Sequence, residues 1–429
     1  MTGRRLLCSF LVTAILLVTF PAAEANAAGS IPVIVKLTSS SGLLRVLNLL
    51  DGAVVDQIPG SNVFLVNVPS LLSIQSLLTL PAGLLQFLGI DWLEINTGVA
   101  LPKVGQVGVI TVGINNTADW YKNQPAMQLI RSNEAKAYST GRSVVVADIN
   151  SQVDYGHPAL RGHLTGGYDF VATRPGGSGS LNQAETGFLD QAETGFLDQD
   201  ASFLQQAETG FLDTSMLPLA SANPAYSHGT LCAGIIAAMA PDSMIMPLRA
   251  FDDQGRADLF ILAKAIRYAA DNGANVINMS FGALDQSKAL KNSTDYARGK
   301  GVILVASAGN NNTSTPQYPA ALAGVLTVAA TNLTDVKASF SNYGNYVFVD
   351  GPGVRIISAY PGGLYAIVSG TSFSGPEVAA TAALFRSIRT WGIANSISST
   401  AVDIDNKNPD YVNKLGYGRI DVLRAVNPN

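Results

Sequence analysis

From residue 141 onward the chain alternates short, uninterrupted apolar runs with longer segments of helical periodicity. Residues 144–147 form one such run, which is typical of a strand buried in a parallel sheet. Residues 258–272 have the spacing of an amphipathic helix, Gly273 follows as its C-cap, and residues 276–279 form the next apolar run. Strands that alternate with helices predict an α/β domain with a doubly wound, mostly parallel sheet flanked by helices.

Size and charge narrow the classes of function. The chain has 429 residues, of which 47% are hydrophobic, and this is ample for one large core and a smaller domain. Only 14% of the residues are charged, and the net charge is −4. This balance gives no reason to expect a nucleic acid or an anionic membrane as a partner.

The N-terminus has the pattern of a secretory signal peptide. Basic residues are followed by an apolar run over residues 6–20, and the small residues 25–27 form a cleavage site. The run is short for a spanning helix, so we expect a signal peptide over residues 1–27 and a secreted, extracellular protein without a membrane span once it is removed. Cys8 lies in this segment, which leaves Cys232 without a disulfide partner in the mature chain, where we expect it to pack in the core.

Residues 28–110 predict a small α+β domain of the ferredoxin-like kind. Residues 31–37 and 63–68 have the composition of strands, and residues 42–50 that of a helix. A second, leucine-rich helix and a strand near residues 92–95 would complete a β-α-β-β-α-β unit.

An internal repeat lies between the first strand of the large domain and the histidine motif described below. Three clean copies of QAETGFLD and one degenerate copy fill residues 183–213. The period is too short for a helical solenoid, so we interpret the segment as a surface-loop insertion that grew by duplication. Cation binding by its carboxylates and a docking strip formed by Phe188, Phe196 and Phe211 are the functional alternatives.

A serine opens the last long apolar segment. Ser372 lies in the motif GTSFSGP, just ahead of residues 378–385, an alanine-rich run that predicts a buried helix. At a helix N-terminus, unpaired backbone N–H groups and the helix dipole favour negative charge, which suits a nucleophile in acyl transfer. A capping role for Thr371 or Ser372 explains this motif equally well when it is taken alone.

Two further motifs precede it, SHGTLCAG with His228 and ASAGN with Asn310. Together and in this order, the three motifs resemble those of the subtilisin-like serine peptidases, the subtilases of peptidase family S8. The resemblance covers roughly residues 120–429 and includes residues 416–421, GYGRID, which match the closing motif of that family.

The resemblance implies a serine endopeptidase that hydrolyses polypeptides through an acyl-enzyme. Ser372 would be the nucleophile, His228 the general base and Asn310 a donor to the oxyanion. The residues that the resemblance places against the substrate are Ser280, Phe281, Gly282, Ser307, Ala308 and Gly309.

The same resemblance assigns roles to the domains. Residues 28–110 would be a propeptide that assists folding of the catalytic domain and inhibits it intramolecularly, with a permanent accessory domain as the alternative. The catalytic domain would span residues 120–429, with the octapeptide-repeat insertion at 183–213. The chemistry requires no cofactor and no metal site is assigned. Structural calcium occurs in the family, but no segment here can be assigned to it, and we expect a monomer.

One position departs from the family pattern. The family places an aspartate that orients the histidine after its first strand, in the sequence VAVIDTGVD, whereas residues 144–154 here read VVVADINSQVD. Alignment on residues 153–158 puts Asn150 in the aspartate position, and alignment on the apolar strand puts Asp148 there. Residues two apart in a strand point to the same face, so both alternatives direct a side chain toward His228. A buried Asp148 would also need a partner.

Two functions follow from these alternatives. With a carboxylate beside the histidine, the chain is an active secreted peptidase. With the amide of Asn150 there, it is a catalytically impaired pseudopeptidase that acts by binding peptides or proteins, or by slow self-processing. Replacing this carboxylate by an amide lowers the turnover of serine peptidases by about 10⁴ and leaves a residual rate.

Overall fold

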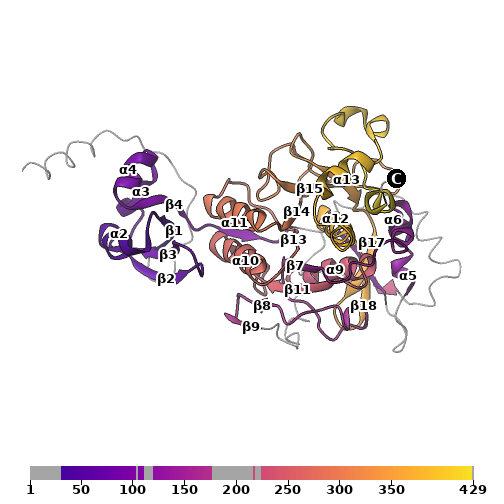
Figure 1. Ribbon diagram of the computed structural model, residues 1–429, viewed down its shortest axis with the longest axis horizontal. Helices are drawn as coiled ribbons and strands as arrows, with labels where there is room; N and C mark the ends of the chain where they lie inside the picture. Colours follow the sequence, from indigo (N-terminus) through magenta and orange to yellow (C-terminus); the bar gives the residue numbers. More distant parts are fainter. Residues whose placement is uncertain (1–29, 103–104, 111–118, 176–215, 218–223, 428–429) are drawn as a thin grey trace, which may run out of the picture. The chain divides into compact units, whose positions relative to one another are not determined.

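The computed structural model describes residues 30–102, 105–110, 119–175, 216–217 and 224–427 (Figure 1). The expected signal peptide and the octapeptide repeats lie outside these residues. The chain divides into two compact units. The smaller contains the described residues up to Gly98, together with Asp258–Lys264 and Ser287–Ala289, and the larger contains the rest.

The smaller unit has a four-stranded antiparallel sheet in the order β2-β3-β1-β4. Its chain order is β-α-β-β-α-α-β, which differs from the expected β-α-β-β-α-β only in having two helices before the last strand. Alternating residues of the strands and one face of the helices form its apolar core. The strands are β1 (Ile31–Leu37), β2 (Ala53–Gln57), β3 (Val63–Val68) and β4 (Ile90–Ile95), and the helices are α2 (Leu43–Leu50), α3 (Leu72–Leu78) and α4 (Ala82–Phe87).

The larger unit is built on an eight-stranded sheet in the order β16-β15-β14-β13-β7-β11-β8-β9. All neighbouring strands are parallel except the pair β8 and β9, which confirms the predicted α/β class. The strands are β7 (Val145–Asn150), β8 (Tyr168–Asp169), β9 (Arg174–Pro175), β11 (Met244–Arg249), β13 (Val276–Met279), β14 (Ile303–Ser307), β15 (Val325–Thr331) and β16 (Val349–Pro352).

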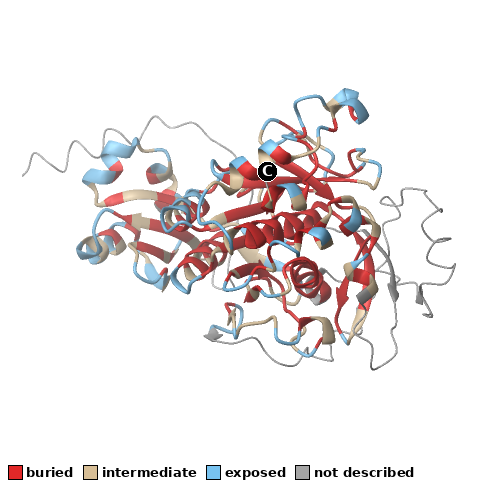
Figure 2. Cartoon of the chain, turned by 45° about the vertical axis from the view of Figure 1, so that its right-hand side comes forward, coloured by how far each residue is buried: buried red, intermediate tan, exposed pale blue. Residues whose placement is uncertain are grey.

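Helices α9 (Pro224–Met239) and α12 (Thr371–Arg386) lie within the core of the larger unit, whereas α10 (Leu259–Asp271) and α11 (Lys288–Gly299) are amphipathic. Every residue of α12 from Thr371 to Phe385 is buried, and Figure 2 shows the buried interior of the molecule in red. A helix made of small and apolar residues on all sides is expected to be buried on all sides. The N-terminus of α12, with Ser372, is therefore fixed by packing rather than held on a mobile loop.

A second sheet changes the expected domain boundary. It has the order β10-β6-β18-β17, in which β6 (Gly105–Ile110) pairs antiparallel with β18 (Leu364–Ser369). The sequence places residues up to 110 in the small domain, whereas this backbone ladder joins residues 105–110 to the larger unit. The remaining strands are β10 (Met216–Leu217), β17 (Ile356–Tyr360) and a separate pair, β5 (Gly98–Ala100) with β12 (Arg256–Asp258).

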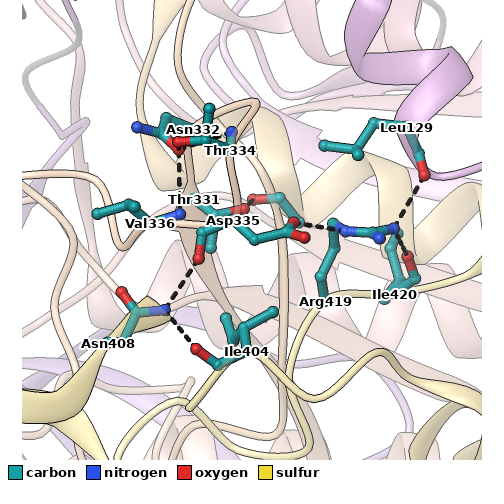
Figure 3. A network of polar contacts seen from close by, with 11 residues as sticks. Leu129, Thr331, Asn332, Thr334, Asp335, Val336, Ile404, Asn408, Arg419 and Ile420 are labelled. Carbon is teal, nitrogen blue, oxygen red and sulfur yellow. Dashed lines mark hydrogen bonds and ion pairs between the residues drawn. The ribbon is translucent and has the colours of Figure 1, made fainter. Parts of the chain in front are cut away.

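A polar network fixes the segment with the GYGRID motif (Figure 3). The buried Arg419 guanidinium donates from Nε to Asp335 Oδ1 at 2.6 Å and from Nη1 to the carbonyl of Leu129 at 2.9 Å. Asn408 Nδ2 donates to the carbonyl of Asp335 at 2.9 Å. Gly418 has φ +91° and a Cβ there would lie 2.1 Å from a carbonyl oxygen, so this position requires glycine. The GYGRID motif therefore has a structural role, because Arg419 and Gly418 hold this segment against its neighbours.

Candidate active site

Strand β7 and helix α9 bring Asn150 and His228 together. The Nδ1 atom of His228 lies 2.7 Å from Asn150 Oδ1, and both side chains are buried. An amide oxygen accepts hydrogen bonds, so Nδ1 of the imidazole carries the proton and Nε2 has a lone pair. Nε2 makes no hydrogen bond to any described residue. This is the tautomer that a general base toward a serine hydroxyl requires.

Asp148 lies deeper on the same face of β7 and is fully buried. Its Oδ2 accepts from Asn150 Nδ2 at 3.1 Å, and its Oδ1 accepts from Asn278 Nδ2 at 2.7 Å. The structure therefore places the amide of Asn150, and not the carboxylate of Asp148, against His228. Asp148 reaches the imidazole through Asn150.

Ser372 is the second residue of α12, and its side chain is fully buried. Its Oγ has no hydrogen-bond partner among the described residues, and its carbonyl oxygen accepts from Ser280 Oγ at 3.0 Å. The Cys232 Sγ atom is 3.5 Å from that carbonyl oxygen and 3.8 Å from His228 Nδ1. One buried thiol thus contacts both segments, which brings the predicted nucleophile and the predicted base to the same place.

Asn310 follows β14 and faces the start of α12. Its Oδ1 accepts from the backbone N–H of Thr371 at 2.9 Å and from Thr371 Oγ1 at 2.8 Å. Because the oxygen end of the amide is bound to Thr371, the NH₂ end carries the donor capacity. Asn310 and the backbone of Ser372 are consequently adjacent, as an oxyanion site requires.

The residues that the sequence assigns to substrate contact lie at the ends of β13 and β14 and are buried where they carry side chains. A Cβ at Gly282 would lie 2.6 Å from Gln317 Oε1, and one at Gly309, where φ is +108°, would lie 2.3 Å from the same atom. Gln317 therefore lies between these two segments. Sequence reasoning missed it, since it stands in a loop without a motif.

Asn278 is a second residue that sequence reasoning missed. It pairs in register with Asp148 across β13 and β7. Its Nδ2 donates to Asp148 and, at 3.1 Å, to Ser280 Oγ, so it connects the carboxylate to the residue that binds the Ser372 carbonyl. The signal was present, because an asparagine inside an apolar strand needs polar partners.

Burial dominates the electrostatics of the site. It lowers the pKa of His228 to about 4, so the imidazole is neutral at pH 7. It raises the pKa of Asp148 to about 7, although the hydrogen bonds from Asn278 and Asn150 oppose that shift. Burial, followed by the charge of Asp148, raises the pKa of Cys232 well above its usual value and keeps its thiol neutral.

No described helix is both long enough and apolar enough to cross a membrane. No group of three or more histidine, cysteine or acidic side chains within the described ranges could hold a metal ion.

Comparisons with known proteins agree with the geometry. The model of the subtilase family, Peptidase_S8, matches residues 141–418. The chain is 34% identical over 359 residues to a thermophilic serine proteinase of Bacillus sp. (strain AK1), covering 76% of this chain and 77% of that protein. It is 31% identical over 316 residues to thermitase of Thermoactinomyces vulgaris, covering 70% of this chain and 94% of thermitase.

Two solved structures share the fold. Fervidolysin from Fervidobacterium pennivorans, a keratinolytic enzyme related to subtilisin, superimposes with a TM-score of 0.71 at 25% identity; the match covers 94% of this chain and 62% of that one. A serine-to-alanine mutant of the epidermin leader peptide processing serine protease from Staphylococcus aureus gives a TM-score of 0.66 at 18% identity, over 94% of this chain and 100% of that one.

Proposed function

Because the chain belongs to the subtilase family, and is thus a serine-type endopeptidase, we propose that it hydrolyses peptide bonds with Ser372 as nucleophile, His228 as general base and Asn150 as the residue that orients the base. The observation that carries this proposal is the 2.7 Å contact between Asn150 Oδ1 and His228 Nδ1. It leaves Nε2 as the proton acceptor, which is the role the mechanism needs.

In the proposed mechanism, Ser372 Oγ attacks the carbonyl carbon of the scissile bond while Nε2 of His228 takes the hydroxyl proton. The imidazolium then gives this proton to the leaving amine, and an acyl-enzyme remains. Water then attacks the acyl carbon while His228 takes a proton from it. The bond to Ser372 Oγ breaks, the imidazolium returns the proton to that oxygen, and a carboxylic acid is released. The amide NH₂ of Asn310 and the backbone N–H of Ser372 stabilise the oxyanion.

The site has the orientation of a triad but lacks its charge at the contact with the histidine. Asn150 is neutral, so it holds the ring without stabilising the imidazolium as a carboxylate would. We therefore propose a slow peptidase rather than a protein that only binds peptides, since Ser372, His228 and Asn310 are all retained.

The wider assignments are part of the same proposal. Residues 1–27 would direct export, and the small α+β unit would inhibit the catalytic domain before maturation. Within this unit, Glu94 accepts hydrogen bonds from Ser287 Oγ at 2.7 Å and from the backbone N–H groups of Lys288 and Ala289, at 2.7 and 2.9 Å. These hydrogen bonds cap the first N–H groups of α11.

The test compares the wild type with Ser372→Ala. We expect the wild type to release peptides from an unfolded protein and to react with a fluorophosphonate probe, and the variant to do neither. If both proteins hydrolyse the substrate at the same rate, Ser372 is not the nucleophile and the proposal is wrong. If neither hydrolyses it and the wild type does not react with the probe, the assigned residues do not form a working site.

A further inference from the structure

We propose that Asp148 is a positioning residue: its carboxylate holds the amide of Asn150 with the oxygen end toward His228, and so selects the tautomer in which His228 acts as a base. This inference rests on the proposed function and deepens it. It assigns a role to a buried carboxylate that does not touch the histidine.

The first step is the direction of the amide. The two ends of an asparagine amide have almost the same shape, but one end accepts hydrogen bonds and the other donates them. Here Oδ1 of Asn150 accepts from His228 Nδ1 at 2.7 Å and from the backbone N–H of Ser151 at 2.8 Å, while Nδ2 donates to Asp148 Oδ2 at 3.1 Å. A flipped amide would place its oxygen against the carboxylate oxygen, and its NH₂ against the N–H of Ser151.

The second step is the consequence of a flip for His228. With NH₂ of Asn150 facing it, Nδ1 would have to accept a hydrogen bond, and the proton would move to Nε2. A protonated Nε2 cannot take the proton of Ser372. The wrong tautomer is the reason that an amide in this place impairs serine peptidases. The orientation of Asn150 therefore decides whether the site works.

The third step is that Asp148 is itself fixed. Its second oxygen accepts from Asn278 Nδ2 at 2.7 Å, so both carboxylate oxygens face NH₂ donors. An ionised carboxylate accepts at both oxygens, whereas an amide at this position would present a donor to one of them. The group at position 148 must therefore be an acceptor at both ends.

Among the described residues, Asp148 is the carboxylate that hydrogen-bonds to Asn150. From α9, the thiol of Cys232 faces it and is neutral, because burial and the carboxylate itself raise the pKa of the thiol. On β11, Arg249 is engaged with Asp169 and Asp253. The negative charge of Asp148 thus acts on the imidazolium that forms during catalysis through the intervening amide.

The test exchanges the two side chains in a double-mutant cycle: Asp148→Asn, Asn150→Asp and the double variant, with kcat and KM measured against an unfolded protein substrate. In the wild-type background, Asp148→Asn should lower kcat at least about tenfold, with little change in KM, because the amide of Asn150 can then flip. In the Asn150→Asp background, the same change should maintain or raise kcat, since it removes a like charge and supplies an NH₂ donor.

This reversal of sign separates positioning from support of the fold. A structural role for Asp148 would lower activity by the same factor in both backgrounds, and that result would overturn the inference. Asp154→Asn is the matched control, because it neutralises a carboxylate that binds the backbone N–H groups of Gly156 and Gly362 instead. It should leave kcat unchanged.

A second measurement does not depend on activity. The chain has three histidines, so ¹⁵N-labelled imidazoles can be assigned by NMR in a Ser372→Ala protein. We expect the proton of His228 on Nδ1, and a shift toward Nε2 when Asp148→Asn is added. An unchanged tautomer overturns the positioning role while the peptidase stands. A shifted tautomer in a chain without Ser372-dependent hydrolysis refutes the proposed function and leaves the positioning role intact.

Discussion

Restoring a carboxylate beside the histidine is the perturbation with the largest expected effect. In Asn150→Asp, the new carboxylate would replace Oδ1, which lies 2.7 Å from His228 Nδ1 in a fully buried site. The reverse change costs serine peptidases about 10⁴ in turnover, which corresponds to about 5 kcal/mol of transition-state stabilisation. A factor of about 10⁴ is therefore the upper limit for the increase in kcat of Asn150→Asp.

The neighbouring carboxylate reduces this gain. Asn150 Nδ2 is 3.1 Å from Asp148 Oδ2, so two ionised carboxylates here would repel each other by about 5 kcal/mol at an effective dielectric constant of about 20. The pair avoids this cost by sharing a proton. Burial already raises the pKa of Asp148 to about 7, and the new charge raises it further, so Asp148 becomes the protonated partner and donates to Asp at position 150. Because His228 already has the working tautomer, only the charge is gained, so we expect kcat to rise by clearly less than about 10⁴-fold.

The assay is hydrolysis of an unfolded protein between pH 6 and 9, with rates normalised by titration of Ser372 with a fluorophosphonate. The double variant Asp148→Asn/Asn150→Asp should exceed the single Asn150→Asp variant, because it has no like charge to accommodate. Equal rates for the wild type and Asn150→Asp over the whole pH range would refute the reasoning. Such a result would mean that a group other than residue 150 stabilises the imidazolium.

Three further predictions concern pH and stability. The kcat of the wild type should fall below about pH 7, as Asp148 takes up a proton, and not only near pH 4 as His228 does; rate profiles of the wild type and Asp148→Asn, which should lack the upper limb, test this. Burial raises the pKa of Glu377 well above its usual value, so its contribution to stability is full below about pH 4.5 and declines as the pH rises; Glu377→Gln should therefore gain in melting temperature relative to the wild type between pH 5 and 9. Arg419→Met should lower the free energy of unfolding by about 3 kcal/mol in urea titrations, because it leaves Asp335 without its partner.

Controls accompany the two stability predictions. Glu134 is an exposed glutamate, so Glu134→Gln should change the melting temperature equally at pH 5 and 9. A gap between wild type and Glu377→Gln that stays constant with pH would contradict the pKa argument. For the ion pair, Asp335→Asn/Arg419→Met should recover part of the loss, and no recovery would show that Arg419 acts through its carbonyl contacts alone.

The fold was accessible from the sequence because its signals are local. Apolar runs such as residues 144–147 and the helix of Ser372 indicate their own burial. The alternation of strands and helices in the small unit followed from periodicity and turns, except that its leucine-rich segment forms two helices instead of one. The boundary near residue 110 was not accessible in this way. Residues 105–110 pair with β18, which lies more than 250 residues later, and no local pattern reports such a partner.

The candidate site likewise has parts that local motifs indicate and parts that only the structure shows. The motifs predict roles for Ser372, His228 and Asn310, but they left Asp148 and Asn150 as alternatives, because a strand presents both on one face. Hydrogen-bond directions, which sequence does not contain, separate the two. The place of Gln317 could not be predicted for a similar reason, since only the approach of two glycine-containing segments shows where its side chain lies.

In the proposed mechanism, the two tasks of a triad carboxylate are divided between two residues. Asn150 orients the base, and Asp148, one hydrogen bond further from the imidazole, supplies the negative charge. Orientation is retained nearly in full, but charge stabilisation weakens with distance and with the protonation of Asp148 near pH 7. The rate of such a site falls most for dilute substrates. It falls least where the scissile bond is held in place, because a high effective concentration offsets a slow chemical step. We therefore predict that the site favours cleavage within the same chain. The ratio of self-cleavage to hydrolysis of added protein should fall when Asn150→Asp restores the charge.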